Sequence, residues 1–459
     1  MESLEQFLLA ANEIAWGWPM LVLLFGTHIF LTVRLRFIQR YIGKAIKISL
    51  GRTREGAGDI SQFGALTTAL AATIGTGNII GVATAITAGG PGAVLWMWLT
   101  GVFGISTKYT EAVLSVKYRI VARDGSMAGG PMYVLQHGMK AKWLGMVFAA
   151  LAAFSAFGIG NMVQSHSIAT MITEAYAIPP VVTGVVLAIL TAAVILGGIK
   201  AIAKVCERLV PLMAIFYVTG CLLLIVLNLE EIPHTLELIF TSAFSGHAAA
   251  GGFLGAVLRD VIREGISKGL FSNESGLGSA PIVAAAARTR NPVRQALVSA
   301  SGTFWDTVVV CAITGITLVN SGEWLRGHEG AALTHAAFSG LPVIGSTILA
   351  VGLLAFAFST ILGWAYYGEK SAEYLFGTAA VRWYRWAWVV LVLLGSSLSL
   401  ETVWSFANVA NALMALPNLV SLLVLSGVAV AETRRYLWSG KIDDQAEGPV
   451  PNDVHERGS

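Results

Sequence analysis

Apolar runs of about 20 residues recur from one end of this 459-residue sequence to the other. A helix rises about 1.5 Å per residue, so each run can cross a hydrocarbon core about 30 Å thick. Charged residues make up 12% of the chain, whereas a soluble domain carries roughly 25%. A soluble protein of this length could not cover its surface with so few charges. The sequence therefore predicts an all-α polytopic membrane protein, embedded in the lipid bilayer.

Eleven apolar segments define the predicted transmembrane helices. Their approximate bounds are 16–33, 62–88, 92–116, 144–172, 180–198, 209–228, 251–286, 296–319, 343–366, 384–400 and 403–431. Residues 1–15 contain glutamates and no basic residue, unlike the positively charged start of a signal peptide. We therefore expect the first segment to be retained as a transmembrane helix.

The lysines and arginines fall almost entirely on one side of these segments. They gather in alternate connections, which are 34–54, 117–142, 199–208, 287–295, 367–385 and the tail 432–459. On the opposite side only Arg326 is basic. Cytoplasmic loops carry such an excess of positive charge. The pattern predicts a cell-membrane protein with its N-terminus outside and a disordered cytoplasmic tail.

The second segment contains an interruption. Gly75 and Gly77 flank Thr76 within it, and Asn78 follows. Glycines and polar residues together at membrane depth predict an unwound stretch, which is tolerated where it lines a cavity. Its free N–H groups suit a carboxylate, and its free carbonyls suit a small cation. A close helix crossing is the alternative, but it explains only the glycines.

The seventh segment contains a second interruption, between Gly265 and Gly278, with Asn273 and Glu274 inside it. Four ionisable residues at 259–264 precede it. They are expected either to pair with one another near the interface or to act in gating.

The two interruptions occupy matching places along the chain. Without the first segment ten remain, and the breaks fall in the first and the sixth of them. Interrupted helices at matching places in two inverted halves indicate a transport site near the midplane of the bilayer. The sequence thus predicts an external segment at 1–15, an extra helix and basic loop at 16–61, and five-helix repeats at 62–228 and 229–431.

Several longer motifs resemble the alanine/glycine:cation symporter family, over about residues 12–435. They are TIGTGNIIGVATAI (73–86), GGPGAVLWMW (89–98), KYTEA (108–112), AGGPMYV (128–134), GIGNMVQ (158–164), GGIKAIAKV (197–205), GLFSNESGLGSAP (269–281) and FSTILGWAYYGEK (358–370). The resemblance implies a LeuT-type 5+5 inverted repeat preceded by one extra helix. It also implies that a sodium ion, or in some members a proton, drives uptake of a small neutral amino acid such as alanine or glycine by alternating access.

The resemblance implies a substrate site at the two breaks. The predicted substrate-binding residues are Thr73, Gly75, Thr76, Gly77, Asn78, Gln164, Phe271, Ser272, Asn273 and Trp364. Backbone N–H groups at Thr76 and Gly77 would receive the substrate carboxylate. The Gln164 amide can donate to the carboxylate of an amino acid and accept from its ammonium group. The alternative role for Gln164 is an interhelical hydrogen bond. Phe271 and Trp364 would form walls or merely pack.

Two further polar residues, Asn161 and Glu274, are candidates for the same site. Three other glutamates, Glu111, Glu369 and Glu401, lie near segment ends and are expected to be ordinary interface carboxylates.

The resemblance places a sodium site beside the first break. The carbonyls of Ala71 and Ile74 and the hydroxyls of Ser359 and Thr360 would hold the ion, because sodium prefers oxygen ligands. For the two hydroxyls alone, a hydrogen bond to a carbonyl of their own helix is the alternative.

Two other classes of function compete with a symporter. An enzyme is disfavoured because neither an HExxH motif nor a Cys/His metal spacing is present. A channel or uncoupled facilitator would move solute without regard to an ion gradient. We expect no cofactor other than the coupling sodium ion, no nucleic-acid partner, and a monomer.

Overall fold

The computed structural model describes residues 10–51, 56–245, 258–342, 344–398, 401–446 and 450–451. The predictions for residues 1–9 and 452–459, and for the first part of the 251–286 segment, lie outside these ranges.

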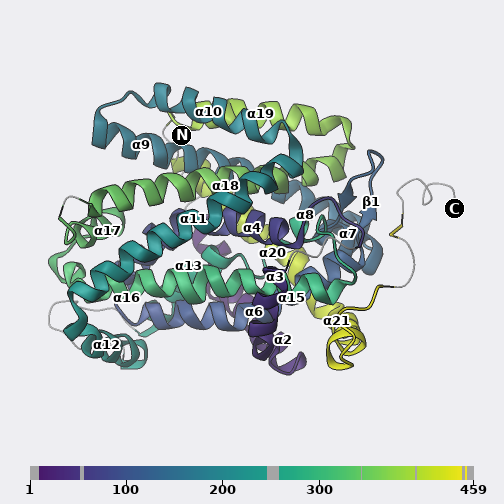
Figure 1. Cartoon of the computed structure of the whole chain (residues 1–459), viewed down its shortest axis with the longest axis horizontal. Coiled ribbons are helices and arrows are strands. Elements are labelled where there is room, and N and C mark those ends of the chain that lie inside the picture. The colour runs from purple at the N-terminus through teal and green to yellow at the C-terminus, as the bar shows by residue number, and fades with distance from the viewer. Residues whose placement is uncertain are drawn as a thin grey trace.

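Most of the described chain is helical (Figure 1). The helices are α2 (Trp18–Arg34), α3 (Ile42–Ser49), α4 (Gln62–Thr73), α5 (Ile80–Gly89), α6 (Ala93–Lys117), α7 (Pro131–Tyr133), α8 (Lys142–Ser155), α9 (Val163–Tyr176), α10 (Pro180–Ile195), α11 (Gly198–Leu227), α12 (Ile232–Ser245), α13 (Leu258–Asn273), α14 (Pro281–Ala284), α15 (Pro292–Thr303), α16 (Ala312–Asn320), α17 (Gly330–Phe338), α18 (Gly345–Phe376), α19 (Ala379–Gly395), α20 (Glu401–Val424) and α21 (Ser426–Thr433). A 3₁₀ turn, η2 (Thr76–Asn78), precedes α5, and two π-helical stretches, η4 (Ala156–Met162) and η6 (Phe304–Cys311), join α8 to α9 and α15 to α16.

Six helical stretches of the described chain are long and apolar enough to cross a membrane. They are Ala10–Arg34, Lys142–Glu174, Gly198–Leu227, Pro292–Asn320, Gly345–Phe376 and Ser405–Val424. Large apolar side chains also point outward along α10 and α11, including Val181, Val185, Ile189, Leu212 and Ile215. A soluble protein rarely exposes so much contiguous apolar surface. The chain is therefore a multi-pass helical membrane protein.

Several helix ends differ from the predicted spans. Helix α11 begins at Gly198 and not near residue 209, and α18 continues to Phe376 and not to about 366. The basic residues of these stretches lie on helices, because hydropathy marks where a helix leaves the hydrocarbon and not where its backbone hydrogen bonds stop. The fold is also not wholly helical, since β1 (Ile120–Val121) and β2 (Met127–Ala128) form a short antiparallel hairpin.

The prediction of a disordered tail from residue 432 is wrong for residues 432–446. Helix α21 extends to Thr433, a π-helical turn covers Arg434–Trp438, and the chain then lies against the start of α15. The amide of Ala446 donates to the carbonyl of Arg290 (2.7 Å), and Asn291 Nδ2 donates to the carbonyls of Ile442 and Asp444 (both 2.9 Å). Polar composition alone misjudged this stretch because its partners, such as Arg290 and Asn291, lie about 150 positions away in the sequence.

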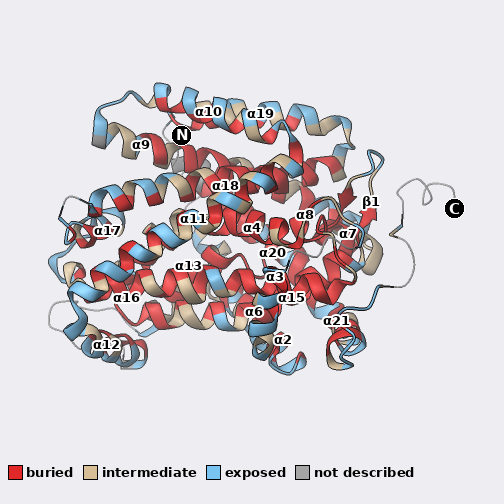
Figure 2. Cartoon of the chain, viewed as in Figure 1, coloured by how far each residue is buried: buried red, intermediate tan, exposed pale blue. Residues whose placement is uncertain are grey.

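The helices that carry the two breaks lie inside the bundle. Helix α4 packs against α11, α15 and α18, and α13 packs against α5 and α6. Helices α10 and α19 run together along one edge of the view in Figure 1. Figure 2 shows buried residues concentrated on the central helices and exposed residues on the rim. The fold therefore places both interruptions in its interior.

Candidate transport site

The first broken helix is interrupted where the sequence predicted. Helix α4 ends at Thr73 and α5 begins at Ile80. In a continuous helix the amide of Gly75 would bond the carbonyl of Ala71. Here it donates instead to Asn78 Oδ1, at 2.9 Å. The Asn78 side chain thus replaces a helical bond and frees a carbonyl at the end of α4.

The second interruption lies between α13 and α14 and is shorter than predicted, because Gly265 and Gly269 lie within α13. Glu274, Gly276 and Gly278 between them have positive φ angles, of 54°, 90° and 88°. The amides of Gly276 and Gly278 both donate to Glu111 Oε1 (3.1 Å each), which also accepts from Asn418 Nδ2 (2.7 Å). A buried carboxylate of α6 therefore holds this loop in its left-handed conformation.

Two of the three glutamates expected at the interface occupy other surroundings. Glu111 is 2% exposed and binds the second break, as described above. Glu369 is buried and accepts from Arg385 Nε (2.6 Å) and Nη2 (2.8 Å). The expectation is wrong for Glu111, whose partners lie at least 165 positions away in the sequence. Glu369 is paired with Arg385, which lies only 16 positions away. The side chain of Glu401 lies outside the described part of the structure.

Asp306 links the two broken helices to each other. It lies in η6 and is fully buried. Its Oδ1 accepts from Asn78 Nδ2 (2.8 Å), and its Oδ2 accepts from Ser272 Oγ (2.9 Å) and Thr307 Oγ1 (2.7 Å). Asp306 is not among the residues predicted from the sequence. An acidic residue inside an apolar segment was the signal that could have found it.

A small cavity lies between the two breaks, with a volume of about 20 Å³. It is lined by Ala72, Thr73, Gly75, Thr76, Gly77, Ile159, Gln164, Phe271, Ser272, Glu274, Thr360, Trp364 and Asn411. Eight of the ten predicted substrate-binding residues are in this set. A volume of this size accommodates about one water-sized group. The residues of the two breaks therefore pack closely around the cavity.

The amino end of the 3₁₀ turn opens into this cavity. Its first bonded amides are those of Asn78 and Ile79. Among the residues that the structure describes, the N–H groups of Thr76 and Gly77 at its start have no main-chain partner. Gln164 lies beside them, with Oε1 3.5 Å from Thr76 Oγ1 and Nε2 donating to the carbonyl of Ile159 (3.0 Å). This side of the cavity therefore presents hydrogen-bond donors.

Glu274 and Trp364 form the polar part of another wall. Trp364 Nε1 donates to Glu274 Oε1 at 3.0 Å, and the Ser279 hydroxyl donates to the other carboxylate oxygen. A Cβ atom added at Gly160 would lie 2.2 Å from the Trp364 Cβ. The indole can occupy this position only because the residue of η4 that faces it, Gly160, has no side chain.

The predicted sodium ligands lie together beside the first break. Ser359 Oγ lies 3.1 Å from the carbonyl oxygen of Ala71, and a Cβ added at Gly75 would lie 2.7 Å from Thr360 Oγ1. Both hydroxyls also donate to the carbonyl of Phe356 in their own helix, at 2.8 and 3.0 Å. Ile74 follows the last residue of α4 and is buried. The structure therefore brings Ala71 and Gly75 at the end of α4 close to the hydroxyls of Ser359 and Thr360 on α18.

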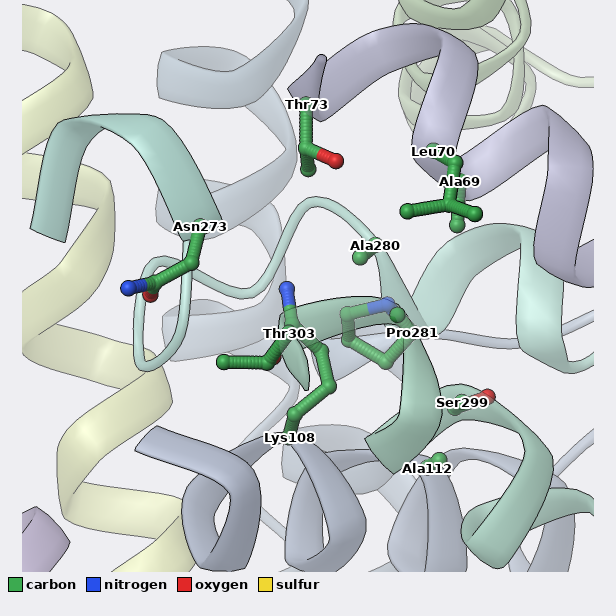
Figure 3. Close-up of a pocket in the computed structure, with 11 residues that line it drawn as sticks. Ala69, Leu70, Thr73, Lys108, Ala112, Asn273, Ala280, Pro281, Ser299 and Thr303 are labelled. Carbon is green, nitrogen blue, oxygen red and sulfur yellow. The ribbon is translucent and has the colours of Figure 1, made fainter. Parts of the chain in front are cut away.

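Three candidate residues point elsewhere. Asn78 is directed toward Asp306, and Asn161 Nδ2 donates to the carbonyl of Trp388 (2.9 Å). Asn273 lines a second cavity, of about 10 Å³, together with Lys108 and Thr303 (Figure 3). Thr73 lines both cavities, so the second cavity lies directly behind the first.

The broken helices are joined where the basic connections lie. Residues 56–60 run beside residues 286–289, and the amide of Arg288 donates to the carbonyl of Ile60 (2.8 Å). The Arg119 guanidinium donates to the carbonyls of Ala57, Ala285 and Ala287, each at 2.9 Å. Burial lowers the pKa of Arg119 to about 10, so it stays charged at neutral pH. These contacts form a closure that holds residues 56–60 against residues 285–289 on the side of the basic connections.

A sequence model of the sodium:alanine symporter family matches residues 1–448. The chain belongs to this family. The sodium/alanine symporter AgcS of Methanococcus maripaludis is 51% identical over 436 residues, which cover 93% of this chain and 95% of that protein. An uncharacterized transporter of Haemophilus influenzae is 49% identical over 452 residues, which cover 97% of this chain and 99% of that protein.

As a member of the sodium:alanine symporter family, the chain is a transporter and not an enzyme. Its fold is also similar to that of a manganese transporter from Eremococcus coleocola. The TM-score is 0.54 at 15% sequence identity, over 85% of this chain and 86% of that protein. This likeness concerns the fold alone.

Proposed function

We propose that this protein couples inward movement of sodium ions to uptake of a small neutral amino acid, alanine or glycine, by alternating access. The observation that carries the proposal is the cavity between the two breaks, which is bordered by free N–H groups and by a freed carbonyl. Membership of the sodium:alanine symporter family and the relative named a sodium/alanine symporter support the choice of solute and ion.

The substrate carboxylate binds at the amino end of the 3₁₀ turn. The N–H groups of Thr76 and Gly77 receive it, since a helix amino end attracts negative charge. Gln164 serves as a second donor to the carboxylate or as an acceptor for the ammonium group. The rings of Phe271 and Trp364 line the cavity and limit the size of the substrate's side chain. This limit favours a substrate as small as alanine.

Sodium binds between α4 and α18. The carbonyls of Ala71 and Ile74 and the hydroxyls of Ser359 and Thr360 provide oxygen ligands, the type that this hard cation prefers. The bound ion orders the break between α4 and α5. The ordered break then holds the N–H groups of Thr76 and Gly77 in position to bind the substrate carboxylate. Each ligand therefore raises the affinity for the other, which couples uphill uptake to the sodium gradient.

The proposed topology has eleven transmembrane helices, with the N-terminus outside and the C-terminus in the cytoplasm. The break between α4 and α5 lies in the first helix of one five-helix repeat, and the break between α13 and α14 lies in the first helix of the other, inverted repeat. Helix α2 is the extra helix. The concentration of basic residues on one side supports the orientation.

Alanine binding to the purified protein, titrated at increasing sodium concentrations, tests this proposal. The expected result is an alanine affinity that rises with sodium and stays low when choline replaces it. An alanine affinity that is the same with both cations would leave an uncoupled facilitator as the better explanation.

A further inference from the structure

Lys108 is a buried cation that the proposed binding steps do not use. It lies in the middle of α6, and 4% of it is exposed. Its Nζ atom has no hydrogen-bond partner among the residues that the structure describes. A buried ammonium group without a partner is costly, so its charge must be balanced by the field around it.

The cavity that contains Lys108 is bounded by the ends of both broken helices. Its lining includes Thr73, the last residue of α4, and Asn273, the last residue of α13. Figure 3 shows the Lys108 side chain rising from α6 toward the loop that follows Asn273. The carboxyl end of a helix carries free carbonyls and a partial negative charge. The ammonium group therefore lies where two negative helix ends converge.

Three buried carboxyl groups also surround this region. Glu111, Glu274 and Asp306 are each at most 4% exposed, and each interacts electrostatically with Lys108. These are the carboxyl groups that hold the second break, line the transport cavity and link the two breaks. His28, on α2, also interacts electrostatically with Lys108. Acidic groups outnumber basic ones here, which favours a further cation and disfavours an anion.

We propose that Lys108 is a resident counter-cation that sets how strongly the core binds the transported sodium ion. This inference rests on the proposed sodium-coupled function. The positive charge of the ammonium group offsets part of the negative charge of the surrounding carboxyl groups and helix ends. It thereby lowers the affinity for sodium to a level at which the ion can be released again. Lys108 acts through the electric field at the breaks and is a positioning residue, not a sodium ligand. Thr73, shared by both cavities, lies between the two cations.

Two variants separate the charge of Lys108 from its size. Lys108→Met removes the charge and keeps most of the chain length, whereas Lys108→Arg keeps the charge. The measurement is the sodium concentration that gives half-maximal alanine binding to the purified protein. We expect Lys108→Met to lower it by about tenfold, because a repulsive unit charge is removed from a partly desolvated region. Lys108→Arg should stay within about threefold of the wild type.

The direction of this effect distinguishes the proposal from a purely structural role. A lysine that merely supported the fold would, once removed, weaken sodium binding. The inference would be overturned if Lys108→Met needed the same or a higher sodium concentration for half-maximal alanine binding than the wild type. If the wild type still showed its sodium dependence, the proposed function would stand. A wild type that binds alanine without sodium would overturn both.

A second neutral variant keeps the test decisive if Lys108→Met does not fold. Glutamine in Lys108→Gln is also uncharged, and its amide can donate and accept hydrogen bonds in the cavity. We expect this variant, too, to lower the sodium concentration for half-maximal alanine binding by about tenfold. An unchanged or higher sodium concentration would contradict the charge-balance argument.

Discussion

The side-chain amide of Asn78 donates a 2.8 Å hydrogen bond to the carboxylate of Asp306, which also accepts from Ser272 on the other broken helix. One buried carboxylate thus connects the two segments that form the transport cavity. We therefore expect ligand binding at one break to affect the other through these two hydrogen bonds.

Asp306→Asn should uncouple the two breaks. The amide keeps the volume but places a donor opposite the Asn78 or Ser272 donor, which leaves a buried polar group unsatisfied. Such a group costs about 1–3 kcal/mol. We expect a lower unfolding temperature in detergent and alanine uptake reduced at least tenfold. Glu230→Gln, on the exposed turn before α12, is the matched control and should change neither. Wild-type uptake by Asp306→Asn would show that the link has no part in transport.

Thr360→Ala should weaken sodium binding more than alanine binding measured at saturating sodium. It removes one proposed oxygen ligand, for which we expect about a tenfold rise in half-saturating sodium. Thr317→Ala is the matched control, because the Thr317 hydroxyl also donates to a carbonyl of its own helix (Ile313, 2.8 Å) but does not line the cavity. Unchanged sodium dependence in Thr360→Ala would remove this residue from the site.

Phe271→Ala should widen the range of substrates. The ring lies within 3.5 Å of a Cβ built on Gly77, and its removal enlarges the cavity beside the first break. Competition of unlabelled amino acids against labelled alanine measures the effect, and we expect valine and leucine to compete only in the variant. Phe154→Ala, on an exposed ring of α8, serves as the control. If larger amino acids stay excluded, the size limit resides in other walls.

Arg119→Gln should loosen the closure on the side of the basic connections. The variant removes the guanidinium that holds the carbonyls of Ala57, Ala285 and Ala287. Amides of residues 56–61 and 285–289 are expected to exchange hydrogen for deuterium at least tenfold faster than in the wild type. Arg326→Gln, on the opposite side and exposed, should leave this exchange unchanged. Equal protection in both variants would mean that other contacts hold the closure.

The sequence predicted the features that depend on local composition. Apolar length located the long helices, and glycines beside polar residues located both breaks. Adjacent residues of a helix differ by about 100° in direction, so the sequence could not decide which neighbour faces the cavity. Ser272 lines the transport cavity, whereas Asn273 lines the one behind it.

The links between the breaks were beyond the reach of the sequence. Asp306 pairs with Asn78 across 228 positions, and Glu111 pairs with Gly276 across 165. No local pattern encodes a hydrogen bond over such a separation. Asp306 and Lys108 could have been noted only as charged residues inside apolar segments. The structure turns this anomaly into a defined arrangement of charges around the breaks.

Uptake of labelled alanine into proteoliposomes under imposed ion gradients tests the central claim most directly. With sodium outside and a negative interior potential, alanine should accumulate above its external concentration, because each inward charge adds about 2.3 kcal/mol per 100 mV. Collapse of the sodium gradient should abolish the accumulation. Entry that only equilibrates alanine, at a rate independent of sodium and of the membrane potential, would contradict the account.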